Sequence, residues 1–141
     1  MKLLEIMFAE YGLKEIPGEI NNPRIVNFAN EIGSTWVQND EVAWCGIFMI
    51  WAAKQVGLER AETLDARSWL DVGLKIDEPQ LGDIVILWRE AIHSWKGHVG
   101  VYINHNKTSV YLLGGNQNNS VCIRPYLIDR VLGYRRLRNL S

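Results

Sequence analysis

Cys45 is the residue of this sequence best suited to nucleophilic chemistry, because it stands at the start of an apolar segment, residues 44–56, that predicts a helix. A thiol attacks only as the thiolate, and the partial positive charge and free N–H groups of a helix N-terminus favour that anion. The same N–H groups could hold an oxyanion. A small residue buried in the core is the alternative interpretation of Cys45, since cysteine often has that role.

His98 begins an alternating apolar segment that predicts a β-strand. On such a strand His98 shares a face with Gly100 and Tyr102, and the missing side chain of Gly100 leaves room for another group to approach. Histidine is the usual base for a cysteine nucleophile because its pKa lies near working pH. We therefore predict that His98 is the base, with a structural or merely exposed histidine as the alternative.

A catalytic imidazole also needs a partner that accepts a hydrogen bond from its second nitrogen. The strand after His98 ends in Asn116 and Gln117, and either amide could be that partner. Strand alternation places these two side chains on opposite faces, so only one should reach His98 unless the strand bulges. Gly114 and Gly115 predict a close approach of backbone or ligand. An ordinary asparagine-rich turn is the alternative.

We expect no metal and no cofactor, because the sequence contains no C-x-x-C pair, no H-E-x-x-H pair and no D-x-D-x-D-G calcium loop. The two cysteines, Cys45 and Cys122, are too few for a disulfide scaffold. They could form one bridge, but a reducing cytoplasm favours free thiols. His93 and His105 lie in polar turns and are expected at the surface.

Four helices are predicted in the first half of the chain. Asn22 is a suitable N-cap, Pro23 suits the first helical position, and Gly33 suits the left-handed end of the second helix. The third helix is apolar on every face, which predicts a buried central helix. The predicted helices cover residues 2–11, 23–32, 44–56 and 66–72.

The apolar period changes to two from residue 81 onward, which predicts strands. These strands cover residues 81–88, 98–103 and 109–115, with a turn at 116–120 and further edge strands at 121–126 and 131–137. Helices followed by a run of strands predict an α+β fold, in which an antiparallel sheet packs on the buried helix.

Length and composition predict one globular domain over residues 1–141, since 48% of the residues are hydrophobic and 22% are charged. The net charge of −1 argues against a nucleic-acid binder, which would need a broad basic surface. No apolar run suits a signal peptide or a membrane span. We therefore expect synthesis in the cytoplasm, no stable membrane insertion and a monomer.

Five arginines gather near the C-terminal end of the sequence. A solvated surface with ion pairs is the simpler interpretation, and contact with an anionic polymer is the alternative. The five are Arg124, Arg130, Arg135, Arg136 and Arg138.

Seven short motifs run in order across nearly the whole chain. They are EIPG at 15–18, NNPRI at 21–25, WC at 44–45, ARSWL at 66–70, PQLGD at 79–83, GHVG at 97–100 and GGNQ at 114–117. Together these motifs resemble the CHAP/NlpC-type cysteine amidohydrolases and peptidases of bacterial cell walls, most of all a small single-domain branch found in phages and bacteria. The resemblance implies a papain-like α+β fold with N-terminal helices and a buried cysteine-bearing helix packed on an antiparallel sheet.

The resemblance also implies roles for individual residues. Cys45 is then the nucleophile and His98 the base. Asn116 is our choice for the third catalytic residue, by analogy to the polar residue on the strand after the histidine strand. Related families vary this position, so Gln117 stays open.

The implied substrate is peptidoglycan, cut at an amide bond by Cys-His-Asn acyl transfer. Asp40 would bind substrate or help to build the oxyanion site, and Trp44 would flank the groove. A phage endolysin with endopeptidase activity, released through a holin, is the first interpretation. The alternatives are an N-acetylmuramoyl-L-alanine amidase, an injected antibacterial effector, a protease or acyltransferase acting outside the wall, and an inactive wall-binding module.

Overall fold

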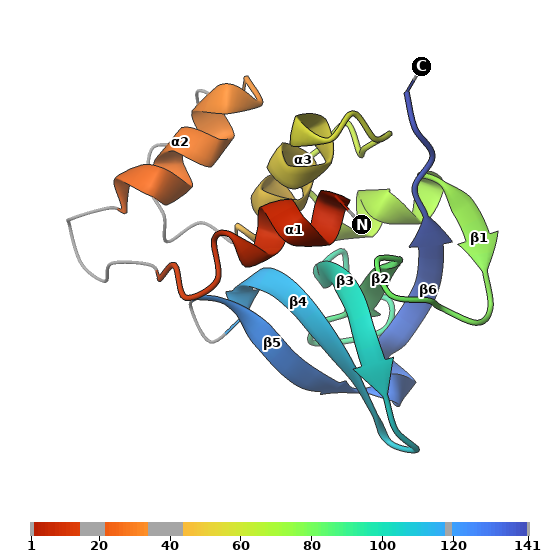
Figure 1. Cartoon of the computed structure of the whole chain (residues 1–141). Coiled ribbons are helices and arrows are strands. Elements are labelled where there is room, and N and C mark those ends of the chain that lie inside the picture. The colour runs from red at the N-terminus through yellow and green to blue at the C-terminus, as the bar shows by residue number, and fades with distance from the viewer. Residues whose placement is uncertain (1, 15–21, 34–43, 118–119, 141) are drawn as a thin grey trace.

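The apolar helix α3, Cys45–Gln55, forms the centre of the molecule in the computed structural model, which describes residues 2–14, 22–33, 44–117 and 120–140. Its residues 45–53 are all buried. The helix packs against the sheet strands β3, Gly97–His105, and β4, Ser109–Gln117. Figure 1 shows the α-helices gathered on one side of that sheet. The predicted buried central helix is thus confirmed, with bounds one residue shorter at each end.

Helix α2, Pro23–Glu31, follows the signals in its sequence closely. The Asn22 side chain accepts a hydrogen bond from the Arg24 N–H at 2.9 Å, and Gly33 takes a left-handed φ of +85° after the helix. The buried ring of Phe28 meets the Trp51 ring of α3 at a centroid distance of 4.4 Å. Aromatic packing therefore holds α2 against α3.

Helix α1, Lys2–Phe8, ends three residues earlier than predicted. The chain turns after it, and Gly12, at φ +91°, donates its N–H to the Val121 carbonyl at 2.8 Å. The Val121 N–H donates in return to the Leu13 carbonyl at 2.8 Å. These bonds tie the segment after α1 to the sheet, so Gly12 and Leu13 do not continue the helix.

One antiparallel sheet contains all six strands in the order β1-β6-β2-β3-β4-β5. The described residues thus form the predicted α+β arrangement. The remaining strands are β1, Leu74–Ile76; β2, Ile84–Trp88; β5, Ser120–Leu127; and β6, Val131–Arg136.

The sheet has an apolar layer on each face. Val99 and Val101 of β3 belong to the core cluster under α3, while Tyr102 belongs to a second cluster on the opposite face with Leu87 and Leu112. The predicted alternation of β3 is therefore confirmed. His98 lies two and four residues from Gly100 and Tyr102, so its position on the strand is on the face of the second cluster.

Four details of the sheet region differ from the expectations. Strand β1 was not predicted, and β6 lies between β1 and β2 rather than at an edge, because β1 pairs with its outer side. The short helix at 66–72 is a 3₁₀ helix, η1, Ala66–Asp71, capped by the Asp65 side chain. A second 3₁₀ turn, η2, Ile128–Arg130, joins β5 to β6. Strand order depends on long-range pairing, which alternation within one strand does not encode.

None of the helices in the described part of the chain is long and apolar enough to cross a membrane. The arginines near the C-terminal end are held in several ways. Arg136 forms a bidentate pair with the buried Asp83, Arg138 pairs with Glu59, and Arg135 donates to the Leu70 carbonyl. Ion pairs and backbone contacts therefore account for these three arginines.

Gly115 of β4 provides a test of how tightly the sheet packs on α3. A Cβ atom at this position would lie 2.6 Å from Cζ3 of the buried Trp44 and 3.1 Å from Cβ of Phe48. We expect Gly115→Ala to lower the free energy of unfolding by about 1–3 kcal/mol, because a fully packed core must shift to admit the methyl group. Urea unfolding followed by circular dichroism measures the change.

Gly133→Ala is the matched control, because its added Cβ would meet the flexible guanidinium end of Arg135 first. The control should lose less stability than Gly115→Ala. Equal losses in the two variants would contradict the tight contact between Trp44 and β4.

Candidate active site

Cys45 is the first residue of α3, with Trp44 at the N-cap position. Its side chain is almost fully buried, with 5% of the residue exposed. Tryptophan has no side-chain oxygen with which to cap the N–H groups of the first helical turn. Gly46 allows the Leu64 carbonyl to approach the helix at this point, where a Cβ atom would clash with it. The thiol therefore lies where the helix dipole favours a negative charge.

The Cys45 thiol and the His98 imidazole form a coupled pair. Burial by itself would raise the pKa of Cys45, but the charge of His98, a hydrogen bond with its ring and a backbone hydrogen bond from Val99 outweigh burial and lower that pKa. Burial by itself would lower the pKa of His98, whereas the charge of Cys45 and hydrogen bonds with Cys45 and Gln117 raise it. Both shifts favour a thiolate beside an imidazolium.

Gln117 holds the other side of the imidazole. Its Oε1 lies 2.8 Å from His98 Nε2. The amide group of Gln117 donates to two backbone carbonyls, those of Leu112 at 2.9 Å and Cys122 at 2.7 Å. Because both amide hydrogens are used, Oε1 is the atom that faces the ring, and it accepts a hydrogen bond from Nε2–H. Nδ1 is then the ring nitrogen available to the thiol.

The hydrogen bond that we expected of Asn116 is thus made by Gln117, and the reason is a bulge. The pairing of β4 with β5 shifts register between Gly114 and Gln117. Within this bulge Asn116 adopts a left-handed φ of +57°, which asparagine tolerates better than most residues. The extra residue breaks the alternation and turns Gln117 toward the histidine face. Asn116 remains close, because it lines a cavity with His98.

The pairing of β3 with β4 ends next to the site. Their paired residues run from His105 with Val110 to Val101 with Leu113. After Leu113, strand β4 continues its pairing with β5. Two residues before Val101 on β3, the Val99 backbone forms a hydrogen bond to Cys45.

Two glycines make room for the Gln117 side chain. A Cβ atom on Gly114 would lie 2.6 Å from Gln117 Oε1, and one on Gly100 would lie 3.4 Å from the same atom. The close approach predicted at Gly114 is confirmed, and the approaching group is the Gln117 amide. Room for a group to approach beside Gly100 was also predicted, and Gln117 Oε1 lies there, in a space that Leu112 and Leu113 also border.

Tyr126 of β5 is a neighbour of the site that the sequence analysis missed. Its hydroxyl lies 3.3 Å from His98 Nε2, and the two rings are 5.1 Å apart at a tilt of 33°. Burial raises the pKa of Tyr126 above its ordinary value, so the hydroxyl stays protonated. An isolated tyrosine on a strand gives no sequence signal, because its proximity to His98, 28 residues earlier in the chain, arises only in the folded sheet.

Trp44 and Asp40 are the two other residues that were predicted to belong to the site. Trp44 was expected to flank the substrate groove, but it is fully buried against β4 and Phe48, which corrects that expectation. The correction has a simple cause, since an indole at the start of a central helix gains more by joining the core. Asp40 lies outside the described residues.

The possible metal-binding side chains of the described residues do not form a cluster. Within the part of the chain that the structure describes, no three His, Cys, Asp or Glu side chains gather as a metal site. Both cysteines are free thiols, and Cys122 donates to the Gln117 carbonyl at 3.2 Å. His93 and His105 are exposed, as expected.

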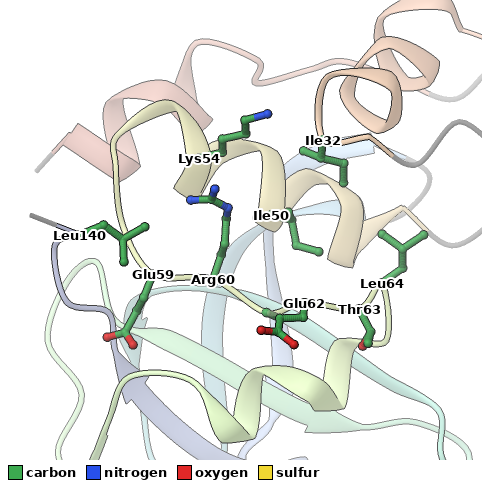
Figure 2. A pocket seen from close by; sticks show the side chains of 10 residues that line it. Ile32, Ile50, Lys54, Glu59, Arg60, Glu62, Thr63, Leu64 and Leu140 are labelled. Atoms are coloured by element: carbon green, nitrogen blue, oxygen red, sulfur yellow. The ribbon is translucent and has the colours of Figure 1, made fainter.

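One cavity adjoins His98, and a larger one is lined by neither Cys45 nor His98. A small cavity of about 140 Å³ adjoins the imidazole of His98. A larger one of about 690 Å³ lies along α3, between Lys54 and the segment 59–64, and Figure 2 shows its lining side chains. Neither Cys45 nor His98 lines the larger cavity. Size alone therefore does not mark the reactive site of this molecule.

No protein-family model matches this chain, and a search of curated proteins finds no match to it either.

Gln117→Met tests the amide that holds the imidazole, because methionine has a similar length and no acceptor oxygen. The hydrogen bond that His98 donates to Gln117 contributes to the raised pKa of His98. We therefore expect the pKa of His98 to fall in this variant, as followed by the ring signals in a proton NMR titration. Asn116→Gly, which suits the left-handed backbone, should leave the titration unchanged. A larger shift in Asn116→Gly than in Gln117→Met would return the role to Asn116.

Alkylation of Cys45 by iodoacetamide tests the coupling between the thiol and the imidazole. A lowered pKa leaves thiolate present at lower pH, so the rate should reach half its maximum below about 8.5, the value of an ordinary thiol. Cys122→Ser in the background removes the second thiol. His98→Ala should move the midpoint upward, because burial remains and the opposing charge is gone. An unchanged midpoint in His98→Ala would disprove the coupling.

Proposed function

We propose that this chain is a cysteine hydrolase with a papain-like site that cleaves an amide bond of peptidoglycan. The observation that carries the proposal is the coupled pair of Cys45 and His98, with Gln117 bonded to the second ring nitrogen. The buried cysteine-bearing helix on an antiparallel sheet also supports a papain-like fold. Gln117 takes the orienting role in this proposal, in place of Asn116.

The first half of the proposed reaction transfers the acyl group to the enzyme. The Cys45 thiolate attacks the carbonyl carbon, and an S–C bond forms while the carbonyl electrons move to the oxygen. In this proposal the backbone N–H of Cys45, the first residue of α3, donates to that oxyanion. The imidazolium of His98 then gives a proton to the leaving nitrogen, the C–N bond breaks, and a thioester remains on Cys45.

The second half returns the enzyme to its starting state. His98, now neutral, takes a proton from water, and the hydroxide oxygen attacks the thioester carbon. The C–S bond breaks and Cys45 leaves as the thiolate, beside an imidazolium once more. Gln117 stays bonded to the ring throughout and keeps Nδ1 directed at the reacting atoms, which is a positioning role.

The choice of peptidoglycan as substrate depends on the resemblance of the sequence motifs to the CHAP/NlpC-type hydrolases. A phage endolysin with endopeptidase activity is the form of the proposal that we favour, acting on the wall after release through a holin. Injection into a rival cell would deliver the same chemistry. Mass spectrometry of muropeptides after digestion identifies the bond, since an endopeptidase splits stem or cross-bridge peptides and an amidase separates the stem from the sugar.

Cys45→Ala and His98→Ala test the hydrolase. Each should abolish the clearing of a cell-wall suspension, with a loss of at least about 10²–10⁴-fold in rate, because one removes the nucleophile and the other the acid–base group. The turbidity of purified wall material gives the rate, and circular dichroism checks that the variants remain folded.

Cys122→Ser is the matched control, because serine keeps a donor for the Gln117 carbonyl and lies outside the proposed chemistry. It should clear the suspension at close to the unmodified rate. Clearing by Cys45→Ala, or complete loss in Cys122→Ser, would exclude the proposed nucleophile.

A further inference from the structure

The small cavity beside His98 has a strongly one-sided charge. Its lining residues are Leu87, Trp88, Arg89, His98, Asn116, Tyr126 and Arg130. Two of these residues are arginines and none is an aspartate or glutamate. At about 140 Å³ the cavity is close to the roughly 150 Å³ that holds a benzene-sized ligand in a protein core. It therefore has room for a carboxylate with a short carbon stem.

Stacking positions the side chain of Arg130, whose guanidinium forms no salt bridge with the residues that the structure describes. Its guanidinium lies over the ring of Trp88, 5.0 Å from the centroid. The Trp88 indole is itself fixed, since its Nε1–H donates to the Asp129 carbonyl at 3.2 Å. Stacking on an aromatic face leaves the edge of a guanidinium, with its paired N–H groups, for a planar anion. A carboxylate accepts two such parallel hydrogen bonds.

Arg89 adds a second charge and connects this cavity to the reacting groups. Its positive charge acts on both Cys45 and His98. The adjacent acid, Glu90, has Lys96 as its own partner at 2.7 Å. Within the described residues neither Arg89 nor Arg130 forms a salt bridge, unlike Arg24, Arg136 and Arg138.

We propose that this cavity is a substrate subsite for a carboxylate carried next to the scissile amide, held by Arg130 and Arg89. The inference rests on the proposed hydrolase function and adds to it a substrate class, an acidic peptide. Its physical basis is the guanidinium of Arg130 positioned on Trp88, beside the imidazole that serves the scissile bond. A neutral carboxamide in the same place would accept no bidentate pair and would meet two uncompensated charges.

The test is an NMR titration of ¹⁵N-labelled Cys45→Ala protein, in which no turnover interferes. N-acetylglycine is the probe, and N-acetylglycinamide is its neutral counterpart. The indole signal of Trp88, assigned with Trp88→Phe, reports occupation of the cavity. We expect a saturable shift with the acid and none with the amide. In Arg130→Gln the acid should bind about tenfold or more weakly, as expected for loss of a charged hydrogen-bond pair.

Arg124→Gln is the matched control, because it removes an equal charge from an exposed residue of β5 that does not line the cavity. It should weaken binding less than twofold. Equal shifts with acid and amide, equal weakening in Arg124→Gln and Arg130→Gln, or no saturation up to about 100 mM would each overturn the subsite.

A kinetic experiment tests this inference separately from the hydrolase proposal. Wall peptides that differ only in a free or amidated carboxyl beside the scissile bond are given to the enzyme with Cys45 intact. Cleavage of both at equal kcat/KM would remove the subsite and leave the hydrolase standing. Selective binding of the acid in the titration, with no Cys45-dependent cleavage of any wall peptide, would leave the anion site and remove the hydrolase.

Discussion

The fixed amide of Gln117 is the contact on which the geometry of the site depends. Two backbone carbonyls take both of its N–H groups, so its oxygen can only face the imidazole. A buried amide that is fully hydrogen-bonded rotates little, because any turn would leave a polar atom unpaired at a cost of about 1–3 kcal/mol. Because Oε1 of Gln117 faces the ring, Nε2 of His98 carries the hydrogen that it donates to this oxygen. The other ring nitrogen, Nδ1, is then the one that meets Cys45.

The register of the sheet changes beside this fixed amide. The pairing of β3 with β4 ends at Val101 and Leu113, and the pairing of β4 with β5 shifts between Gly114 and Gln117. Glycine at positions 100 and 114 leaves space for the amide, and Gly115 lets the same strand lie flat on Trp44. The candidate site thus lies where the regular pairing of the strands is interrupted.

Much of the local structure could be predicted because it depends on near neighbours in the sequence. The cap at Asn22, the apolar surface of α3 and the alternation of β3 each arise from spacing within one element. Strand β1 escaped prediction because three residues carry too little pattern, and the inner position of β6 depends on a partner 60 residues away. The same limit explains Tyr126, whose contact with His98 requires the fold of three strands.

The sequence by itself determined which residues have suitable chemistry: a cysteine at the start of an apolar helix, a histidine on a strand next to a glycine, and two amides after a pair of glycines. Only the tertiary structure decided between those amides, through the left-handed backbone of Asn116 and the bulge around it. The physical reason is that side chains along a strand alternate between the two faces of the sheet, and a bulge breaks this alternation by inserting one more residue. Whether a bulge forms is set by the packing of both neighbouring strands, and no spacing along one strand records it.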